Sequence, residues 1–162
     1  MNLELVADDP LVVARWVASR IPLLDGWIAS GHWPFGDVMD GMPLPFRAIG
    51  LKADGVLQVG AVYDNWRPFI PEIEITLAVQ EDRPLCLEAA KMAWRAFLAY
   101  PFLDLGCRRL TARTAVSNDR CLAMLTTMGF RLEGLLRHGA GTEDAAMWGL
   151  YRDEALRRLG AQ

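Results

Sequence analysis

Two glutamates, Glu72 and Glu74, occupy alternate positions in a segment with the residue pattern of a β-strand. Since successive side chains of a strand point to opposite faces, these two carboxylates share one face. A carboxylate can accept or donate a proton during a reaction, and so can a thiol such as that of Cys121. The structural alternatives are two carboxylates on a solvated face and a small apolar residue at position 121.

Other familiar catalytic patterns are missing from the sequence. His32 and His138 are its only histidines, and with three scattered cysteines they give no metal-ligand spacing, so we expect no bound metal. The sequence has no Gly-x-Ser-x-Gly elbow, no Walker loop and no dinucleotide fingerprint. These absences argue against the corresponding classes of hydrolase, nucleotide-binding protein and dehydrogenase.

The composition favours one globular domain over residues 1–162, with 52% hydrophobic and 23% charged residues. No apolar run approaches the ~20 residues of a membrane span, and the first residues lack the pattern of a secretory signal. Three cysteines without a pairing pattern indicate reduced thiols. We therefore expect a cytoplasmic protein that does not contact a membrane.

The charge of the chain is unevenly distributed. The formal net charge of -3 argues against a general binder of nucleic acid. Residues 105–138 nevertheless carry six arginines against two carboxylates, a local formal charge of +4. This basic region suits a small phosphorylated ligand, and the alternative is a set of arginines spread over a solvated face.

Punctuation residues predict the order of the elements. Asp9-Pro10 is typical of a helix start, Asp54-Gly55 of a hairpin, and Gly129 of a left-handed helix end. We predict helices at 10–20, 23–28, 84–98, 118–128 and 153–159, strands at 46–52, 56–63, 72–79, 109–116, 130–137 and 146–152, and a turn at 65–68.

The central unit of this order is strand, helix, strand. Two strands joined by a helix are most simply parallel, with a right-handed crossover, whereas the flanking hairpins are antiparallel. The predicted fold class is therefore α/β (α+β), with a mixed, mostly antiparallel central sheet, a parallel strand–helix–strand crossover and helices on both faces.

A run of short motifs follows this unit: Asn118-Asp119-Arg120-Cys121, Met128-Gly129-Phe130, Glu133-Gly134 and Arg137. With the order of elements, the run resembles the acyl-CoA half of the GNAT N-acetyltransferase superfamily, especially the branch that acetylates ribosomal-protein N-termini. Gly60-Ala61-Val62-Tyr63 and Ala99-Tyr100-Pro101-Phe102 are also similar to segments of a divergent GNAT branch among phage and prophage proteins. The resemblance covers roughly residues 56–152 and indicates a bacterial or phage-related protein.

The resemblance implies acetyl-CoA as cosubstrate. In the family, the pantetheine arm bonds the backbone of the first parallel strand, and the diphosphate lies at the N-terminus of the following helix, where free N–H groups favour negative charge. The cofactor contacts implied for this chain are Leu77, Val79, Arg83, Leu85, Cys86, Asn118 and Arg120.

The phosphate loop departs from the family pattern, which is Arg or Gln, two residues, Gly, one residue, then Gly or Ala. Residues 80–86 contain no glycine, and Pro84 has no N–H to donate. Glu81 and Asp82 place two carboxylates where a dianion would lie, and Arg83 is the loop residue that offsets them. The cofactor is then held mainly through pantetheine and the basic second half, or it is not held.

The resemblance also implies catalytic roles. A strand glutamate is a common base in the superfamily, and Glu74 lies nearer the expected reacting centre than Glu72. The usual tyrosine acid is replaced here by Leu125. Cys121, at a position where the ribosomal-protein branch can carry serine, is the remaining candidate acid, with a thiol pKa of ~8.5. The structural alternative for Asn118 is a helix N-cap.

Aromatic residues complete the candidate site. Trp33, Phe35, Tyr63 and Trp66 are expected to line an acceptor cleft, the alternative being core or interface packing. The resemblance implies transfer of an acetyl group to the amine of a small molecule or peptide. The alternatives are a catalytically inactive GNAT-fold binding or assembly protein and a phage-type enzyme that modifies nucleic-acid bases. Since family members are often dimers, a homodimer is also expected.

Overall fold

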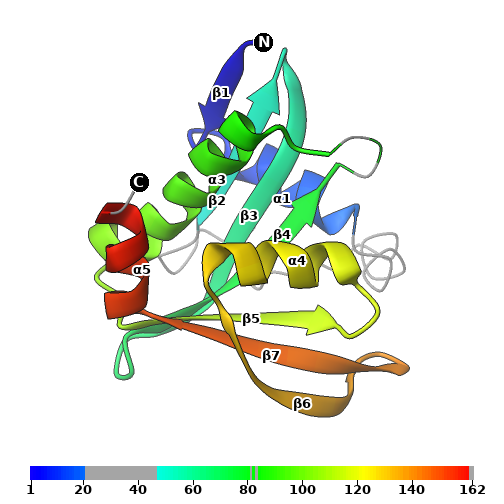
Figure 1. Cartoon of the computed structure of the whole chain (residues 1–162), viewed down its shortest axis with the longest axis vertical. Helices are drawn as coiled ribbons and strands as arrows, with labels where there is room; N and C mark the ends of the chain where they lie inside the picture. Colours follow the sequence, from blue (N-terminus) through cyan, green and yellow to red (C-terminus); the bar gives the residue numbers. More distant parts are fainter. Residues whose placement is uncertain (21–46, 81, 83, 161–162) are drawn as a thin grey trace. The chain divides into compact units, whose positions relative to one another are not determined.

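The computed structural model describes residues 1–20, 47–80, 82 and 84–160 (Figure 1). Its elements are, in order, β1 (Leu3–Val6), α1 (Pro10–Ala18), β2 (Arg47–Ala53), β3 (Val56–Arg67), β4 (Glu72–Val79), α3 (Leu87–Ala99), the π-helical turn η2 (Tyr100–Asp104), β5 (Arg109–Ala115), α4 (Asp119–Met128), β6 (Arg131–Ala140), β7 (Glu143–Tyr151) and α5 (Arg152–Gly160).

The strands form a seven-stranded sheet in the order β1-β2-β3-β4-β5-β7-β6. The pairs β1–β2, β2–β3, β5–β7 and β6–β7 are antiparallel, and β4–β5 is parallel. The crossover from β4 to β5 passes through α3 and η2. The predicted fold class, a mixed and mostly antiparallel sheet with one parallel crossover and helices packed on it, is confirmed.

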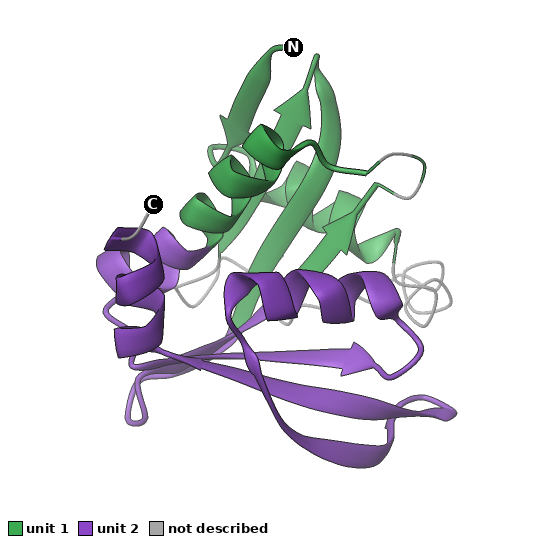
Figure 2. Cartoon of the chain, viewed as in Figure 1, with its two compact units in different colours: residues 1–64, 76–97 green, residues 65–75, 98–162 purple. Residues whose placement is uncertain are grey.

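The chain divides into two compact units (Figure 2). Unit 1 comprises residues 1–64 and 76–97, and unit 2 comprises residues 65–75 and 98–162. Strand β4 contributes its first residues to unit 2 and its last residues to unit 1. The expectation of one domain over residues 1–162 stays a prediction. No helix among the described residues is long and apolar enough to cross a membrane.

In unit 1, helices α1 and α3 cover opposite faces of the sheet. Asp9 and Pro10 start α1 as predicted, because the Asp9 carboxylate accepts a hydrogen bond from the Val12 N–H at 3.4 Å. Its buried side chains pack with Ala48, Val62 and Ala78 of the strands; they are Val13, Ala14, Val17 and Ala18. Tyr63 follows Val62 and therefore faces the other way, where its hydroxyl donates to the Phe97 carbonyl of α3 at 2.5 Å.

In unit 2, the local signals at both ends of α4 act as predicted. The Asn118 side chain caps its first turn, and Gly129 ends it in the left-handed conformation, with a φ of 97°. The Thr114 hydroxyl of β5 accepts a hydrogen bond from the Trp148 indole of β7 at 3.1 Å, and both side chains are buried. Buried Leu110 and Leu150 pair across the same two strands, so one face of unit 2 is a packed core.

Several elements differ from the predictions: α3 begins at Leu87 rather than at 84, β6 extends to Ala140, β7 begins at Glu143, and η2 was not predicted. Strand β3 continues to Arg67, so the turn lies at residues 68–71 rather than at 65–68. Asn65 adopts a left-handed conformation, with a φ of 54°, and the strand continues past it. Strand β1 was not predicted, because its four residues carry too short an apolar pattern. The predicted helix at 23–28 lies outside the described residues.

Replacing Gly60 of β3 by alanine is expected to destabilise the protein. The added Cβ would lie 2.8 Å from Val17 Cγ2 and 3.3 Å from the Trp16 ring of α1. Overpacking of this kind costs about 1–3 kcal/mol, which would lower the midpoint of urea denaturation. Gly134→Ala is the matched control, since its Cβ would meet nothing within 4 Å. Equal losses in the two variants would contradict the close approach of α1 to β3.

Candidate active site

The parallel ladder between β4 and β5 is short. Its register pairs Glu72 with Arg109, Ile73 with Leu110 and Glu74 with Thr111, and all three pairs lie within unit 2. Both strands are longer than this ladder, since β4 runs on to residue 79 and β5 to residue 115. Glu74 is therefore the residue of β4 at which the ladder ends.

Glu72 is engaged in ion pairs. Its carboxylate lies 3.2 Å from Arg109 Nε and 3.5 Å from Arg67 Nη1. The Glu72 side chain is only 15% exposed, so its charge depends on these two guanidinium groups for compensation. Such pairing suits a carboxylate that holds strands together better than one that exchanges protons with a substrate.

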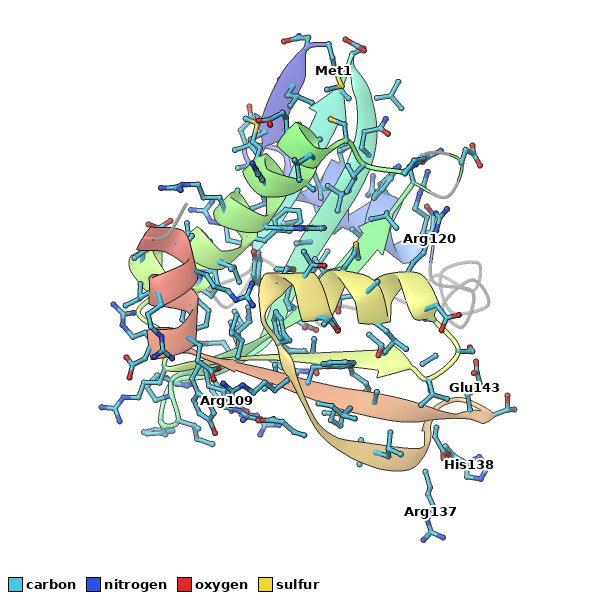
Figure 3. All side chains as sticks on the ribbon, in the orientation of Figure 1. Met1, Arg109, Arg120, Arg137, His138 and Glu143 are labelled. Carbon is cyan, nitrogen blue, oxygen red and sulfur yellow. The ribbon has the colours of Figure 1, made fainter. Side chains whose placement is uncertain are left out.

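Arg109, which Figure 3 labels, is the centre of this ionic cluster. Besides Glu72, it binds the carboxylate of Glu133 on β6 through both of its terminal nitrogens, with Nη1 at 2.6 Å from Oε2. The guanidinium carbon also lies 5.7 Å from the centre of the Tyr151 ring of β7. Hydrogen bonding to Glu133 raises the pKa of Arg109 above its usual range, so this guanidinium stays charged. The cluster therefore joins β4, β5, β6 and β7 of unit 2.

A bulge and a glycine allow Glu133 to reach Arg109. Leu132 pairs with Trp148 and Gly134 with Met147, so Glu133 is an additional residue in β6. Its carboxylate crosses β7 at Gly149, where an added Cβ would lie 2.5 Å from the Glu133 carboxyl carbon. The Glu133-Gly134 motif thus has a structural role that its position in the sequence did not reveal.

Glu74 has a different environment from Glu72. Its carboxylate accepts a hydrogen bond from the Asn65 side-chain amide at 3.2 Å. Among the described residues, no arginine or lysine forms an ion pair with Glu74. The Asn65 amide is neutral, so it orients the Glu74 carboxylate without compensating its charge.

On α4, the N-cap interpretation of Asn118 is confirmed, because its Oδ1 accepts a hydrogen bond from the Cys121 N–H at 3.2 Å. Cys121 is 8% exposed, and burial raises its pKa to about 11. Proton transfer from such a thiol to a thiolate of ordinary pKa ~8.5 is uphill by roughly 3 kcal/mol. This favours the apolar, structural interpretation of Cys121. Arg120 beside it is exposed.

The cofactor candidates of unit 1 lie on both sides of the loop that joins β4 to α3. Leu77 is buried and Val79 is half-buried on β4, whereas Leu85 is half-buried and Cys86 exposed just before α3. The Cys86 sulfur accepts a hydrogen bond from the Ala89 N–H at 3.4 Å and so caps the first turn of α3. Arg83 lies outside the described residues.

The acceptor candidates separate into three groups. Tyr63 is fully buried and its hydroxyl is bonded to Phe97, which favours the core interpretation. Trp66 is half-buried near the end of β3. Trp33 and Phe35 lie outside the described residues. Sequence reasoning missed Arg109, Glu133 and Gly149, and the one available signal was the Glu133-Gly134 pair within the resemblance.

Comparison with solved structures identifies the fold. A spermidine N-acetyltransferase SpeG chimera of Vibrio cholerae and hSSAT sequences has 16% identity, a TM-score of 0.68, and coverage of 98% of this chain and 100% of its own. The dodecameric spermidine N-acetyltransferase of Vibrio cholerae has 17% identity, a TM-score of 0.67, and coverage of 96% and 97%. A probable acetyltransferase has 20% identity, a TM-score of 0.65, and coverage of 94% of both chains. No family model and no curated protein matches the sequence.

These similarities extend over nearly the whole chain at low identity. The chain therefore has the GNAT fold of N-acetyltransferases, and the resemblance read from the sequence is confirmed at the level of the fold.

The three thiols are expected to differ in reactivity. Cys86 is exposed, whereas Cys107 and Cys121 are buried and have pKa values raised to about 11 by desolvation. Brief iodoacetamide treatment at about pH 8 should alkylate Cys86 in the native protein and the other two only after unfolding. Peptide mass spectrometry reads the three sites separately. Native labelling of Cys121 at the rate of Cys86 would restore it as a candidate acid.

Gly149→Ala is expected to displace Glu133 from Arg109 and to lower the free energy of unfolding by about 1–2 kcal/mol. A double-mutant cycle measured by urea denaturation tests whether this loss arises from the contact between Glu133 and Arg109. In a Glu133→Ala background the same glycine change should cost only a few tenths of a kcal/mol, since the bridge is already lost. Additive losses would show that Gly149 acts independently of Glu133.

Proposed function

We propose that this protein transfers an acetyl group from acetyl-CoA to a primary amine. The observation that carries the proposal is the end of the β4–β5 ladder at Glu74, on a fold shared with N-acetyltransferases. A carboxylate without a cationic partner among the described residues lies at the strand position where the resemblance predicts a base.

Glu74 acts as the general base in this proposal. It accepts a proton from the acceptor ammonium, directly or through water, and leaves an amine with a free electron pair. The amine nitrogen attacks the thioester carbonyl, so a C–N bond forms and the C–S bond breaks. The nitrogen loses its second proton to solvent to give the neutral amide, CoA leaves as a thiolate that takes up a proton from solvent, and Glu74 returns its proton to solvent. Asn65 orients the base, and Glu72 serves through its ion pairs as a positioning residue.

The donor is held by backbone and by positive charge. Leu77 and Val79 lie on β4 beyond the ladder, on the strand where the resemblance implies contacts to a pantetheine arm. Asn118 and Arg120 begin α4, and Cys86 precedes α3, whose first N–H groups favour negative charge. Acetyl-CoA supplies the activated acyl group, and these residues bind and orient it.

The first acceptors to test are polyamines, followed by a peptide with a free N-terminus. Two structural neighbours are spermidine N-acetyltransferases, and the formal net charge of this chain, -3, favours a polycationic acceptor. One of those neighbours is dodecameric, so assembly of several copies is part of the proposal, as is a cytoplasmic location.

Binding and turnover together test this function. Isothermal titration with acetyl-CoA and free CoA is expected to show micromolar binding, and spermidine is expected to release free thiol from acetyl-CoA. Absence of binding up to about 1 mM would overturn the cosubstrate and leave a non-catalytic GNAT-fold protein.

Glu74→Gln is expected to lower kcat by about 10²-fold or more, since the base is lost. The dissociation constant of acetyl-CoA should change by less than about twofold. The matched control is Glu72→Gln, which deprives Arg109 of a charged partner. This variant should lower the urea midpoint, whereas its kcat should fall by much less than that of Glu74→Gln. Wild-type kcat in Glu74→Gln would remove Glu74 as the base.

A further inference from the structure

An arginine far upstream in the sequence meets the start of the loop that lacks glycine. Arg20, just past the end of α1, donates from Nη2 to the Gln80 side-chain oxygen at 2.5 Å. Gln80 directly follows β4, and its backbone N–H donates to the Gln58 carbonyl of β3 at 2.8 Å. Both residues belong to unit 1. The arginine is therefore fixed to the strand end from which the loop departs.

Aromatic stacking and helix-end contacts hold the guanidinium in place. Its carbon lies 3.9 Å from the centre of the Trp16 ring, one helical turn earlier. Nη1 donates weakly to the Trp16 carbonyl at 3.5 Å and to the Ser19 hydroxyl at 3.2 Å. Because Trp16 itself packs against the buried cluster under α1, the charge is presented on a rigid support.

The contacts to described residues leave capacity for an anion. Arginine has five N–H donors, and Arg20 uses three hydrogen bonds toward neutral oxygens of the described residues. No carboxylate in the described part of the chain forms an ion pair with it. Its planar fork is suited to the paired oxygens of a phosphate group.

The charge of the loop gives this arginine a role. Residues 80–86 carry Glu81 and Asp82 against Arg83, a formal charge of -1. Gln80 also donates to the Asp82 carboxylate at 3.4 Å, so its amide lies between Arg20 and an acidic group. The Asp82 carboxylate would repel a phosphate that approaches Gln80. Together with residues 80–86, Arg20 gives a formal charge of zero. It also adds hydrogen-bond donors in place of the N–H groups of the missing glycines.

We propose that Arg20 binds a phosphate group of acyl-CoA and replaces part of the missing glycine-rich loop. This inference rests on the proposed function, because it assigns a further binding residue to the same cosubstrate. The positive charge comes from α1, about 60 residues before the loop. The ligand group is a phosphate ester or diphosphate, not the acyl or pantetheine portion.

Titration calorimetry with two donors tests the proposal. Wild type, Arg20→Gln, Arg20→Lys and the control Arg15→Gln, an exposed arginine of the same helix, are each titrated with acetyl-CoA and with S-acetylpantetheine, which has no phosphate. Arg20→Gln should weaken acetyl-CoA binding by about ten- to a hundredfold and leave S-acetylpantetheine binding unchanged. Arg20→Lys, which keeps the charge but not the fork, should lose less, and Arg15→Gln should bind like wild type.

The remaining outcomes each overturn a different claim. Wild-type acetyl-CoA affinity in Arg20→Gln would show that Arg20 does not meet a phosphate, while the proposed function would stand. Equal weakening toward both donors, with a lowered urea midpoint, would show that Arg20 acts only through the fold. If wild type binds neither donor, the proposed cosubstrate fails and this inference fails with it. Inorganic phosphate competing as well as CoA would show a general anion site instead.

Discussion

The pairing of one guanidinium with two carboxylates is the constraint on which unit 2 depends. Arg109 lies between Glu72 of β4 and Glu133 of β6 and is half-buried, so removal of either carboxylate would take away one of its two charged partners. Since the β4–β5 ladder comprises only three residue pairs, this cluster supplies much of what keeps the two strands in register at Glu72. The bulge at Glu133 and the missing side chain at Gly149 are the local features that make the cluster possible.

The same ion pairs give the two glutamates on one face of β4 different surroundings. Glu72 is held by Arg109 and Arg67, and its charge is used for cohesion. Glu74, two residues later, meets the Asn65 amide and keeps its charge available. In the proposed reaction the general base has to be free of such ion pairs, because it must reach the acceptor amine. Burial raises the pKa of the Cys121 thiol to about 11, so in the proposed reaction solvent is a better proton source for the CoA thiolate than Cys121.

Residues 80–86, between β4 and α3, have neither a glycine N–H nor a net positive charge with which to bind a phosphate. Charge on a stacked side chain is a physically different solution from backbone donation. A guanidinium held against Trp16 and Gln80 loses little conformational entropy on binding, because it is already oriented. The cost is the nearby Asp82 carboxylate, which bonds the same Gln80 amide. Residues 80–86 look unsuitable for a diphosphate when the sequence is read alone, because the arginine proposed to compensate them lies about 60 residues earlier in the chain.

The sequence by itself determined the features that depend on neighbouring residues. Asp9 and Asn118 start helices, Gly129 ends one, and Asp54-Gly55 turns a hairpin, because caps and turns need only a few adjacent residues. With strand periodicity, these signals were sufficient for the mixed sheet and its parallel crossover. Only the tertiary structure decided that Glu72 meets Arg109, that Tyr63 is buried against Phe97, and that Arg20 reaches Gln80. These contacts join residues far apart in the chain, where pairing depends on register and helix packing that no local pattern encodes.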